Sequence, residues 1–155
     1  MRLPIHNSYV NSLHCPLLCM KGSYVLVLEL ESDREIAVGK LGTLPFKKGY
    51  YVYVGSALNG LEHRLQRHLS DEKRFHWHID YLLAQASITD IFFREGETRE
   101  ECAIVQHFAT FFSSIPRFGC SDCSCKSHLF FGTLGDIEGC ITSLNMSPYL
   151  LTETT

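Results

Sequence analysis

The chain has 155 residues, 45% of them hydrophobic, and a formal net charge of −3. This length suffices for one domain with a substantial core and is too short for two ordinary domains. The weakly acidic balance excludes a basic field over the whole surface, so any contact with nucleic acid would depend on a local patch. Seven cysteines, an odd number, without a signal-peptide pattern favour a reducing, cytoplasmic setting over a disulfide scaffold. The apolar runs have strand length and predict no membrane-spanning segment.

The first strand is predicted from Gly22. Residues 1 to 20 lack periodicity, and we expect an irregular extension there, with Met20 as an alternative start. After Gly22 the side chains alternate cleanly, which is typical of a half-buried strand. One face carries Tyr24, Leu26, Leu28 and Leu30. Residues 36 to 39 are expected to pair back on this strand.

The stretch Gly49–Leu69 joins an aromatic strand, with Tyr53 on one face, to a helix through an Asn-Gly dipeptide. A rotation of about 100° per residue places Arg64 and His68 beside the apolar side of this helix and Arg67 outward. Interior charge must be paired or used. Two readings remain open: a salt bridge for Arg64 with a hydrogen-bonded core histidine, or a functional site. A local basic patch would consist of His63, Arg64, Arg67, His68, Lys73 and Arg74.

A second helix is predicted from about Phe75 to Ala86, and residues 88 to 94 form a further strand of the same sheet. His76 and Asp80 are one helical turn apart. They could therefore bond to each other, contact a phosphate or hold a metal. The alternative is a local pair that only stabilises the helix.

A third helix carries an apolar stripe, and Glu101 falls at the centre of that stripe by the same angular count. One explanation is a capping box, in which Thr98 is the N-cap and Glu101 reaches back to its amide.

Farther along, Cys120, Cys123, Cys125 and His128 lie within nine residues and would close a tetrahedral zinc site. The alternative there is a metal-free loop held by hydrogen bonds. Residues 129 to 131 are predicted as a final strand, and residues 134 to 155 as a hairpin, with 137 to 141 folding back, or a tail.

These motifs together resemble the GIY-YIG nuclease superfamily, most closely its Uri-type branch. The resemblance covers roughly residues 22 to 131. It rests on Gly22-Ser23-Tyr24 and on the later segments YVYVGSA, RHL, HWHIDYLL and GCSDCxCxSHLF. It implies an α/β (α+β) sandwich in which a small, mainly antiparallel sheet of three or four strands packs with three helices. The two tyrosine strands are then expected to lie side by side, although an inserted strand and loop separate them in sequence.

The resemblance also implies an activity, Mg²⁺- or Mn²⁺-dependent hydrolysis of a nucleic-acid phosphodiester bond, with DNA as the favoured substrate. The implied catalytic residues are Tyr24, Tyr53, Arg64 and His68, and Glu101 is the implied metal ligand. Ser56 and Gly119 stand where excision-repair relatives carry lysine and asparagine. Ser56, His76, His78 and Asp80 would then contact the phosphate or support the residues that bind it and the metal.

The rival hypothesis is a non-catalytic module that binds nucleic acid or protein on the same fold, with Arg64 and Glu101 paired to each other. A homodimer or a partner protein would supply targeting in either case, since small nucleases often need a second unit to grip DNA. A zinc enzyme ranks last, because three thiolates and a histidine leave no open position for water.

Overall fold

The computed structural model describes residues 20–98, 100–120 and 123–150. Apart from Met20, the predicted N-terminal extension lies outside these ranges. The strands are β1 (Gly22–Leu30), β2 (Arg34–Ala37), β3 (Thr43–Phe46), β4 (Gly49–Ala57), β5 (Ser87–Glu95), β6 (Ser113–Ser114), β7 (Leu129–Gly132) and β8 (Ser147–Pro148). The helices are η1 (Gly39–Leu41), α3 (Leu61–Leu69), α4 (His78–Leu83), α5 (Glu101–Phe111) and α6 (Leu134–Ser143), of which η1 is a short 3-10 helix.

The main sheet has six strands in the order β6-β7-β4-β1-β5-β8, and every neighbouring pair is antiparallel. The α+β class and the antiparallel character are as predicted, whereas the expected three or four strands are too few. The difference lies partly at the edges, where β6 and β8 have two residues each and leave no alternation to read in the sequence.

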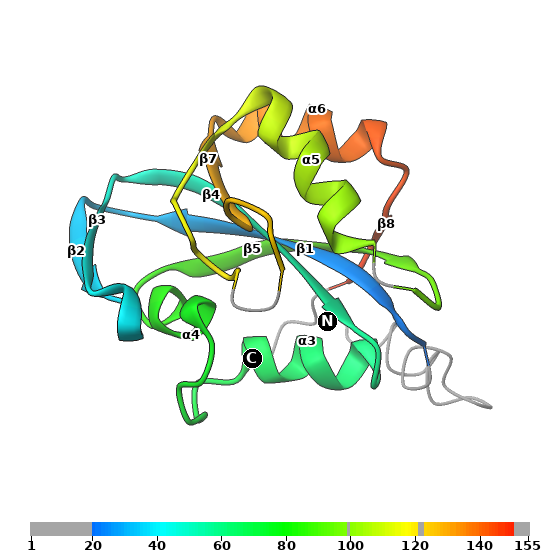
Figure 1. The fold of residues 1–155 in the computed structure, drawn as a ribbon, viewed down its shortest axis with the longest axis horizontal. Helices are drawn as coiled ribbons and strands as arrows, with labels where there is room; N and C mark the ends of the chain where they lie inside the picture. Colours follow the sequence, from blue (N-terminus) through cyan, green and yellow to red (C-terminus); the bar gives the residue numbers. More distant parts are fainter. Residues whose placement is uncertain (1–19, 99, 121–122, 151–155) are drawn as a thin grey trace.

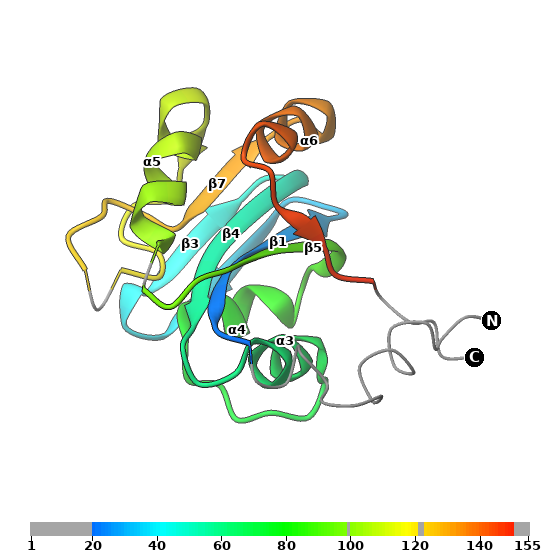
Figure 2. The same ribbon diagram turned by 90° about the vertical axis from the view of Figure 1, so that its right-hand side faces the viewer.

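Helices cover both faces of this sheet, α3 and α4 on one side and α5 and α6 on the other (Figures 1 and 2). The strands alternate accordingly. Tyr24 and Leu26 of β1 pack in the core with α3 and α4, while Val25 and Val27 pack in the core with α5 and α6. We call these the α3/α4 face and the α5/α6 face.

The two tyrosine strands are direct neighbours, as expected. In the β1–β4 ladder Tyr24 lies opposite Gly55, and Leu26 lies opposite Tyr53, so both tyrosines belong to the α3/α4 face. The chain between them forms the separate hairpin β2–β3. The expectation that residues 36 to 39 would pair with the first strand was therefore wrong, because β2 pairs with β3 instead.

The C-terminal part contains a helix where a strand was expected at residues 137 to 141. Thr133 caps α6 by accepting a hydrogen bond from the Asp136 amide at 3.2 Å. Ile137, Cys140 and Ile141 of this helix are buried against the α5/α6 face, at a spacing of three to four residues that suits a helix. The expectation of a strand at residues 137 to 141 was therefore wrong.

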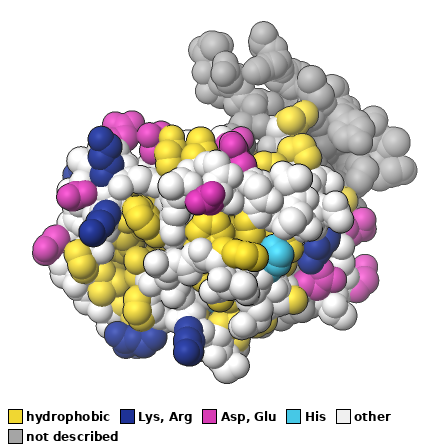
Figure 3. Space-filling model, turned by 90° about the horizontal axis from the view of Figure 1, so that it is seen from above, with side chains coloured by type: hydrophobic (Ala, Val, Ile, Leu, Met, Phe, Trp, Pro, Cys, Tyr) yellow, Lys and Arg dark blue, Asp and Glu magenta, His cyan; other side chains and the backbone are white. Residues whose placement is uncertain are grey.

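The surface above α5 and α6 carries apolar side chains between groups of both charges (Figure 3). This face shows no continuous basic field, in line with the net charge of −3. Within the described ranges, no helix combines the length and the apolar character needed to cross a membrane.

Candidate functional site

A small pocket of about 80 Å³ lies where the α3/α4 face meets the first turn of α5. It opens beside the end of β4, beyond the residues that pair with β7. The lining residues come from seven separate parts of the chain: Tyr24, Tyr53, Val54, Gly55, Ser56, Arg64, Trp77, His78, Glu101, Gly119 and His128. Six of the residues expected at the catalytic site are thereby brought together: Tyr24, Tyr53, Ser56, Arg64, His78 and Glu101.

Gly55 allows the Tyr24 ring to reach the pocket. A Cβ atom at position 55 would lie 2.5 Å from this ring, so the tyrosine occupies the space that any other side chain would fill. The two residues face each other across the β1–β4 ladder. The glycine after Tyr53-Val54 is therefore a steric requirement of this site.

Tyr24 and His68 form a buried hydrogen bond of 2.6 Å between the phenol oxygen and Nε2. Burial raises the pKa of Tyr24 to about 12, although the nearby Arg64 guanidinium opposes this shift. Burial, assisted by Arg64, lowers the pKa of His68 to about 3, so the imidazole is neutral at physiological pH. Its Nδ1 has no hydrogen-bond partner among the described residues. His68 does not line the pocket, but it contacts three lining residues: it bonds to Tyr24, and its ring packs against Tyr53 and Trp77.

Arg64 lies at the pocket wall beside Tyr24, and two further contacts hold it. Its Nη1 donates to the Ser56 carbonyl at 2.8 Å, and its guanidinium lies 4.5 Å from the centre of the Trp77 ring. The guanidinium of Arg67 lies 4.3 Å from the same ring centre. The two cations hold the indole by cation–π contacts. Trp77 was missed by the sequence analysis, which noted only the histidines beside it.

Arg67 does not point outward as predicted. It forms a two-pronged ion pair with Asp80, with both N–O distances at 3.0 Å, and the Asp80 side chain is fully buried. Asp80 also accepts from the backbone amides of His76 and Trp77. Although burial alone would raise the pKa of Asp80, these hydrogen bonds lower it.

Asp80 therefore stabilises the support of the pocket and lies outside its lining. The His76 side chain is exposed and also lies outside the lining, so the expected contact between His76 and Asp80 is made by the backbone amide alone.

Glu101 is the first residue of α5 and is only 8% exposed. The N-cap is Glu100, which makes no side-chain capping bond, so the predicted capping box with Thr98 does not form. Within the described part of the chain, no hydrogen bond or ion pair reaches the Glu101 carboxylate. A nearly buried carboxylate needs a positive partner. The open side of the pocket offers room for a cation on its oxygens.

His78 and Gly119 close another wall of the pocket. The Gly119 amide donates to His78 Nδ1 at 2.8 Å, so the remaining ring proton lies on Nε2. Gly119 has a φ of 76° and packs so tightly that a Cβ there would lie 3.2 Å from both Tyr53 and His128. Position 119 therefore requires a glycine.

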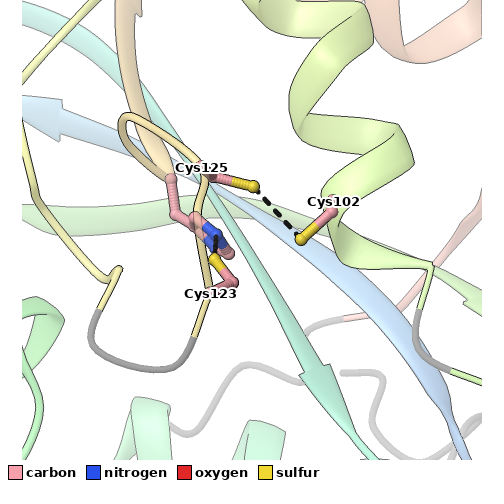
Figure 4. Close-up of side chains that lie close together, drawn as sticks. Cys102, Cys123 and Cys125 are labelled. Atoms are coloured by element: carbon pink, nitrogen blue, oxygen red, sulfur yellow. Dashed lines mark hydrogen bonds between the residues drawn. The ribbon is translucent and has the colours of Figure 1, made fainter.

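A cysteine cluster shares His128 with the lining of the pocket. Its atoms come from Cys102, Cys123, Cys125 and His128, and the four possible ligand atoms lie within 4.8 Å of one another (Figure 4). The cluster can hold a metal ion. The predicted fourth ligand, Cys120, is not a member: its thiol contacts the Phe118 carbonyl at 3.5 Å. Cys102 takes that place from α5, more than 20 residues away in sequence and so outside any local motif.

Comparison with curated proteins finds no similar sequence, and comparison with solved structures finds no similar fold. One family profile matches residues 23–146, which includes both the pocket and the cysteine cluster. The family carries the description "Domain of unknown function DUF123". The match spans well over half of the chain, and this protein therefore belongs to the DUF123 family.

Proposed function

We propose that this protein is a metal-dependent endonuclease that hydrolyses a nucleic-acid phosphodiester bond, as the resemblance to GIY-YIG nucleases implies. One observation carries the proposal: a carboxylate, an arginine and two tyrosines from distant parts of the chain converge in a single pocket. The pocket of about 80 Å³ is much smaller than the roughly 300–1,000 Å³ typical of sites that enclose a whole small molecule. It suits one charged group of a larger substrate, such as a phosphate.

Glu101 would hold the single Mg²⁺ or Mn²⁺ ion of the reaction. Hard divalent cations prefer oxygen ligands, and one carboxylate with water and substrate phosphate oxygens is a common arrangement for Mg²⁺. When bound, the ion would stabilise negative charge on the phosphate. The nearly buried position of Glu101 and its lack of a partner in the described residues support this role.

Tyr24 would orient the attacking water and accept its proton, with His68 or Tyr53 assisting. At rest the pair is a neutral phenol and a neutral imidazole, because burial shifts both pKa values away from neutrality. Neutral His68 would hold and orient the phenol through the 2.6 Å hydrogen bond. Tyr24 can act as a base only as the phenolate, which positive charge at the pocket would stabilise.

Arg64 would stabilise the charge that builds up on the phosphorus-bound oxygens. Its guanidinium is fixed by the Ser56 carbonyl and by Trp77, so it does not have to reorganise during the reaction. His78, whose Nε2 carries the ring proton, is a second donor in the lining. These two donors, with Ser56, would take the place of the lysine and asparagine that excision-repair relatives carry.

DNA is the favoured substrate, and the partner surface would be the basic residues beside the pocket. His63 and Arg74 are exposed and Lys73 is half-buried, on α3 and the loop that follows it. The face above α5 and α6 carries groups of both charges (Figure 3). A second copy of the chain or a partner protein would add the remaining grip on the duplex.

The rival function is binding of nucleic acid or protein without turnover. It predicts that Arg64 and Glu101 neutralise each other. Instead, Arg64 bonds to the Ser56 carbonyl, and no ion pair between the two occurs in the residues that the structure describes. This arrangement favours the enzyme over the binding module.

The test is cleavage of branched, damaged and single-stranded DNA in Mg²⁺, in Mn²⁺ and in EDTA. We expect cleavage only with metal, and a loss of about 100-fold or more for Glu101→Gln. Glu97→Gln is the matched control, because Glu97 is exposed, lies in the same connection and makes only a 3.7 Å ion pair with Lys21. Cleavage in EDTA, or a Glu101→Gln rate within about threefold of wild type, would contradict the assignment.

A further inference from the structure

We propose that Cys102, Cys123, Cys125 and His128 hold one structural zinc ion, and that this ion fixes the first turn of α5. The zinc site does not depend on the proposed nuclease function. Its effect on Glu101, described below, rests on that function.

The cluster already has the composition of a closed zinc site. Three thiolates and one imidazole are soft and borderline ligands that select zinc over Mg²⁺. Tetrahedral zinc with Zn–S bonds of about 2.3 Å separates its ligands by about 3.8 Å. Here Cys102 and Cys125 Sγ are 3.1 Å apart, Cys123 Sγ and His128 Nε2 are 3.2 Å apart, and all four atoms lie within 4.8 Å. Shifts of about 1 Å or less would complete the coordination.

The His128 ring supplies independent support, since its tautomer is set by a partner outside the cluster. Nδ1 lies 3.1 Å from the Val54 carbonyl, an oxygen that can only accept, so Nδ1 carries the proton. Nε2 therefore presents its lone pair to the thiols. Metal-bound histidines usually have their second ring nitrogen held in this way. His128 is also buried, which leaves the ring no freedom to turn away.

The proposed ion would join three parts of the fold. Cys102 belongs to α5, Cys123 and Cys125 belong to the loop after Phe118, and His128 precedes β7 (Figure 4). The first turn of α5 lacks a side-chain cap, so the metal replaces an ordinary stabilising interaction there. A site with four protein ligands leaves no open position for water, and its role is therefore structural.

Glu101 immediately precedes Cys102, and this neighbour relation links the two sites. Consecutive helical residues point about 100° apart, so the thiol can bind the cluster while the carboxylate faces the pocket. Fixing Cys102 orders the same turn that presents Glu101. Outer residues that orient a metal ligand typically change metal affinity or activity by about 10- to 100-fold. Loss of zinc should therefore lower the affinity of the pocket for Mg²⁺ by about tenfold or more.

The experiment compares Cys102→Ser with Cys120→Ser in the full chain, purified without added metal. Cys120 is the matched control, since it lies in the same loop and beside Cys123 without being one of the four clustered ligands. We expect about one zinc per wild-type chain by elemental analysis. Cys102→Ser should lose zinc and melt at a lower temperature, and Cys120→Ser should keep both. Zinc retained in Cys102→Ser, zinc lost in Cys120→Ser, or a Cys102–Cys125 disulfide in place of zinc would overturn the site.

Cobalt substitution covers the case in which Cys102→Ser does not fold. Cobalt in the wild-type and Cys120→Ser proteins should give equally intense thiolate charge-transfer bands, and Cys125→Ser should reduce them by about a third, because one of three thiolates is lost. Bands that weaken in Cys120→Ser would overturn the assignment of Cys102. Zinc present without any DNA cleavage would sink the nuclease proposal and leave the zinc site standing. Cleavage without zinc would do the reverse.

Discussion

The two faces of the sheet bury the same strands in different ways. The α5/α6 face is packed by aliphatic and aromatic side chains such as Val27, Ile104 and Phe108. The α3/α4 face places His68, and the fully buried Asp80, beside its apolar core. Buried polar groups cost stability unless they are paired. The difference teaches that the α5/α6 face is closed almost wholly by apolar side chains, while the α3/α4 face joins its apolar core to buried polar groups that support the pocket.

The sharpest test of this contrast is Arg64→Ala. We expect a loss of about 10³-fold in cleavage rate, about 4 kcal/mol of transition-state stabilisation, because a fixed donor to the developing charge is removed. Its free energy of unfolding should change little. The counterpart Ile141→Val on the α5/α6 face should lose about 1 kcal/mol of stability and keep its rate. The measurements are steady-state cleavage and urea unfolding of both variants. An Arg64→Ala cleavage rate near that of wild type would contradict the proposed role of the α3/α4 face.

Asp80→Asn is expected to have the next largest effect, on the free energy of unfolding. It removes the charge that pairs with Arg67 across two 3.0 Å contacts and should lower the free energy of unfolding by about 3 kcal/mol. Cleavage should also fall, since Arg67 supports Trp77 and thereby Arg64. Asp90→Asn, at an exposed position, is the control and should stay within about 0.5 kcal/mol of wild type. Equal stability for both variants would show that the ion pair contributes nothing.

The smallest effect concerns pH. The fold lowers the pKa of His68 from 6.5 to about 3, so between these values the unfolded chain binds a proton that the folded chain does not. The contribution of His68 is therefore complete above about pH 6.5 and is lost as the pH falls toward 3. His68→Gln should reduce the loss of unfolding free energy between about pH 7 and pH 5 by about 1–2 kcal/mol. Parallel pH profiles for the two proteins would refute this account.

Much of the central architecture follows from local pattern. The alternation from Gly22, the helix after Asn59-Gly60 and the strand at residues 88 to 94 all match elements of the structure. The angular count correctly turned Arg64 and His68 toward the sheet. These successes share a cause, because each depends on one face of one element meeting a continuous core.

The failures are long-range. The helix angle predicted that Arg67 points outward, yet its side chain pairs with Asp80. The periodicity of one helix cannot predict a partner on another element. Cys102 joins three residues distant in sequence, whereas Cys120, although closer to them in sequence, is not among the clustered ligands. Trp77 also went unpredicted. The only signal for it was the spacing of Arg64 and Arg67, which are three residues apart on one helix and both contact its ring.

The β2–β3 hairpin has a consequence for the order in which the chain folds. It pairs residues close in sequence and shortens the loop between β1 and β4, which lowers the entropy cost of joining those strands. Pairing is then expected to start near Leu30–Gly49 and to extend toward Gly22–Ala57, so that Tyr24 meets Gly55 late. The pocket would be the last part to assemble and the first to open. Native-state hydrogen exchange would show this as faster exchange at Gly55 than at Val52, and the reverse order would rule it out.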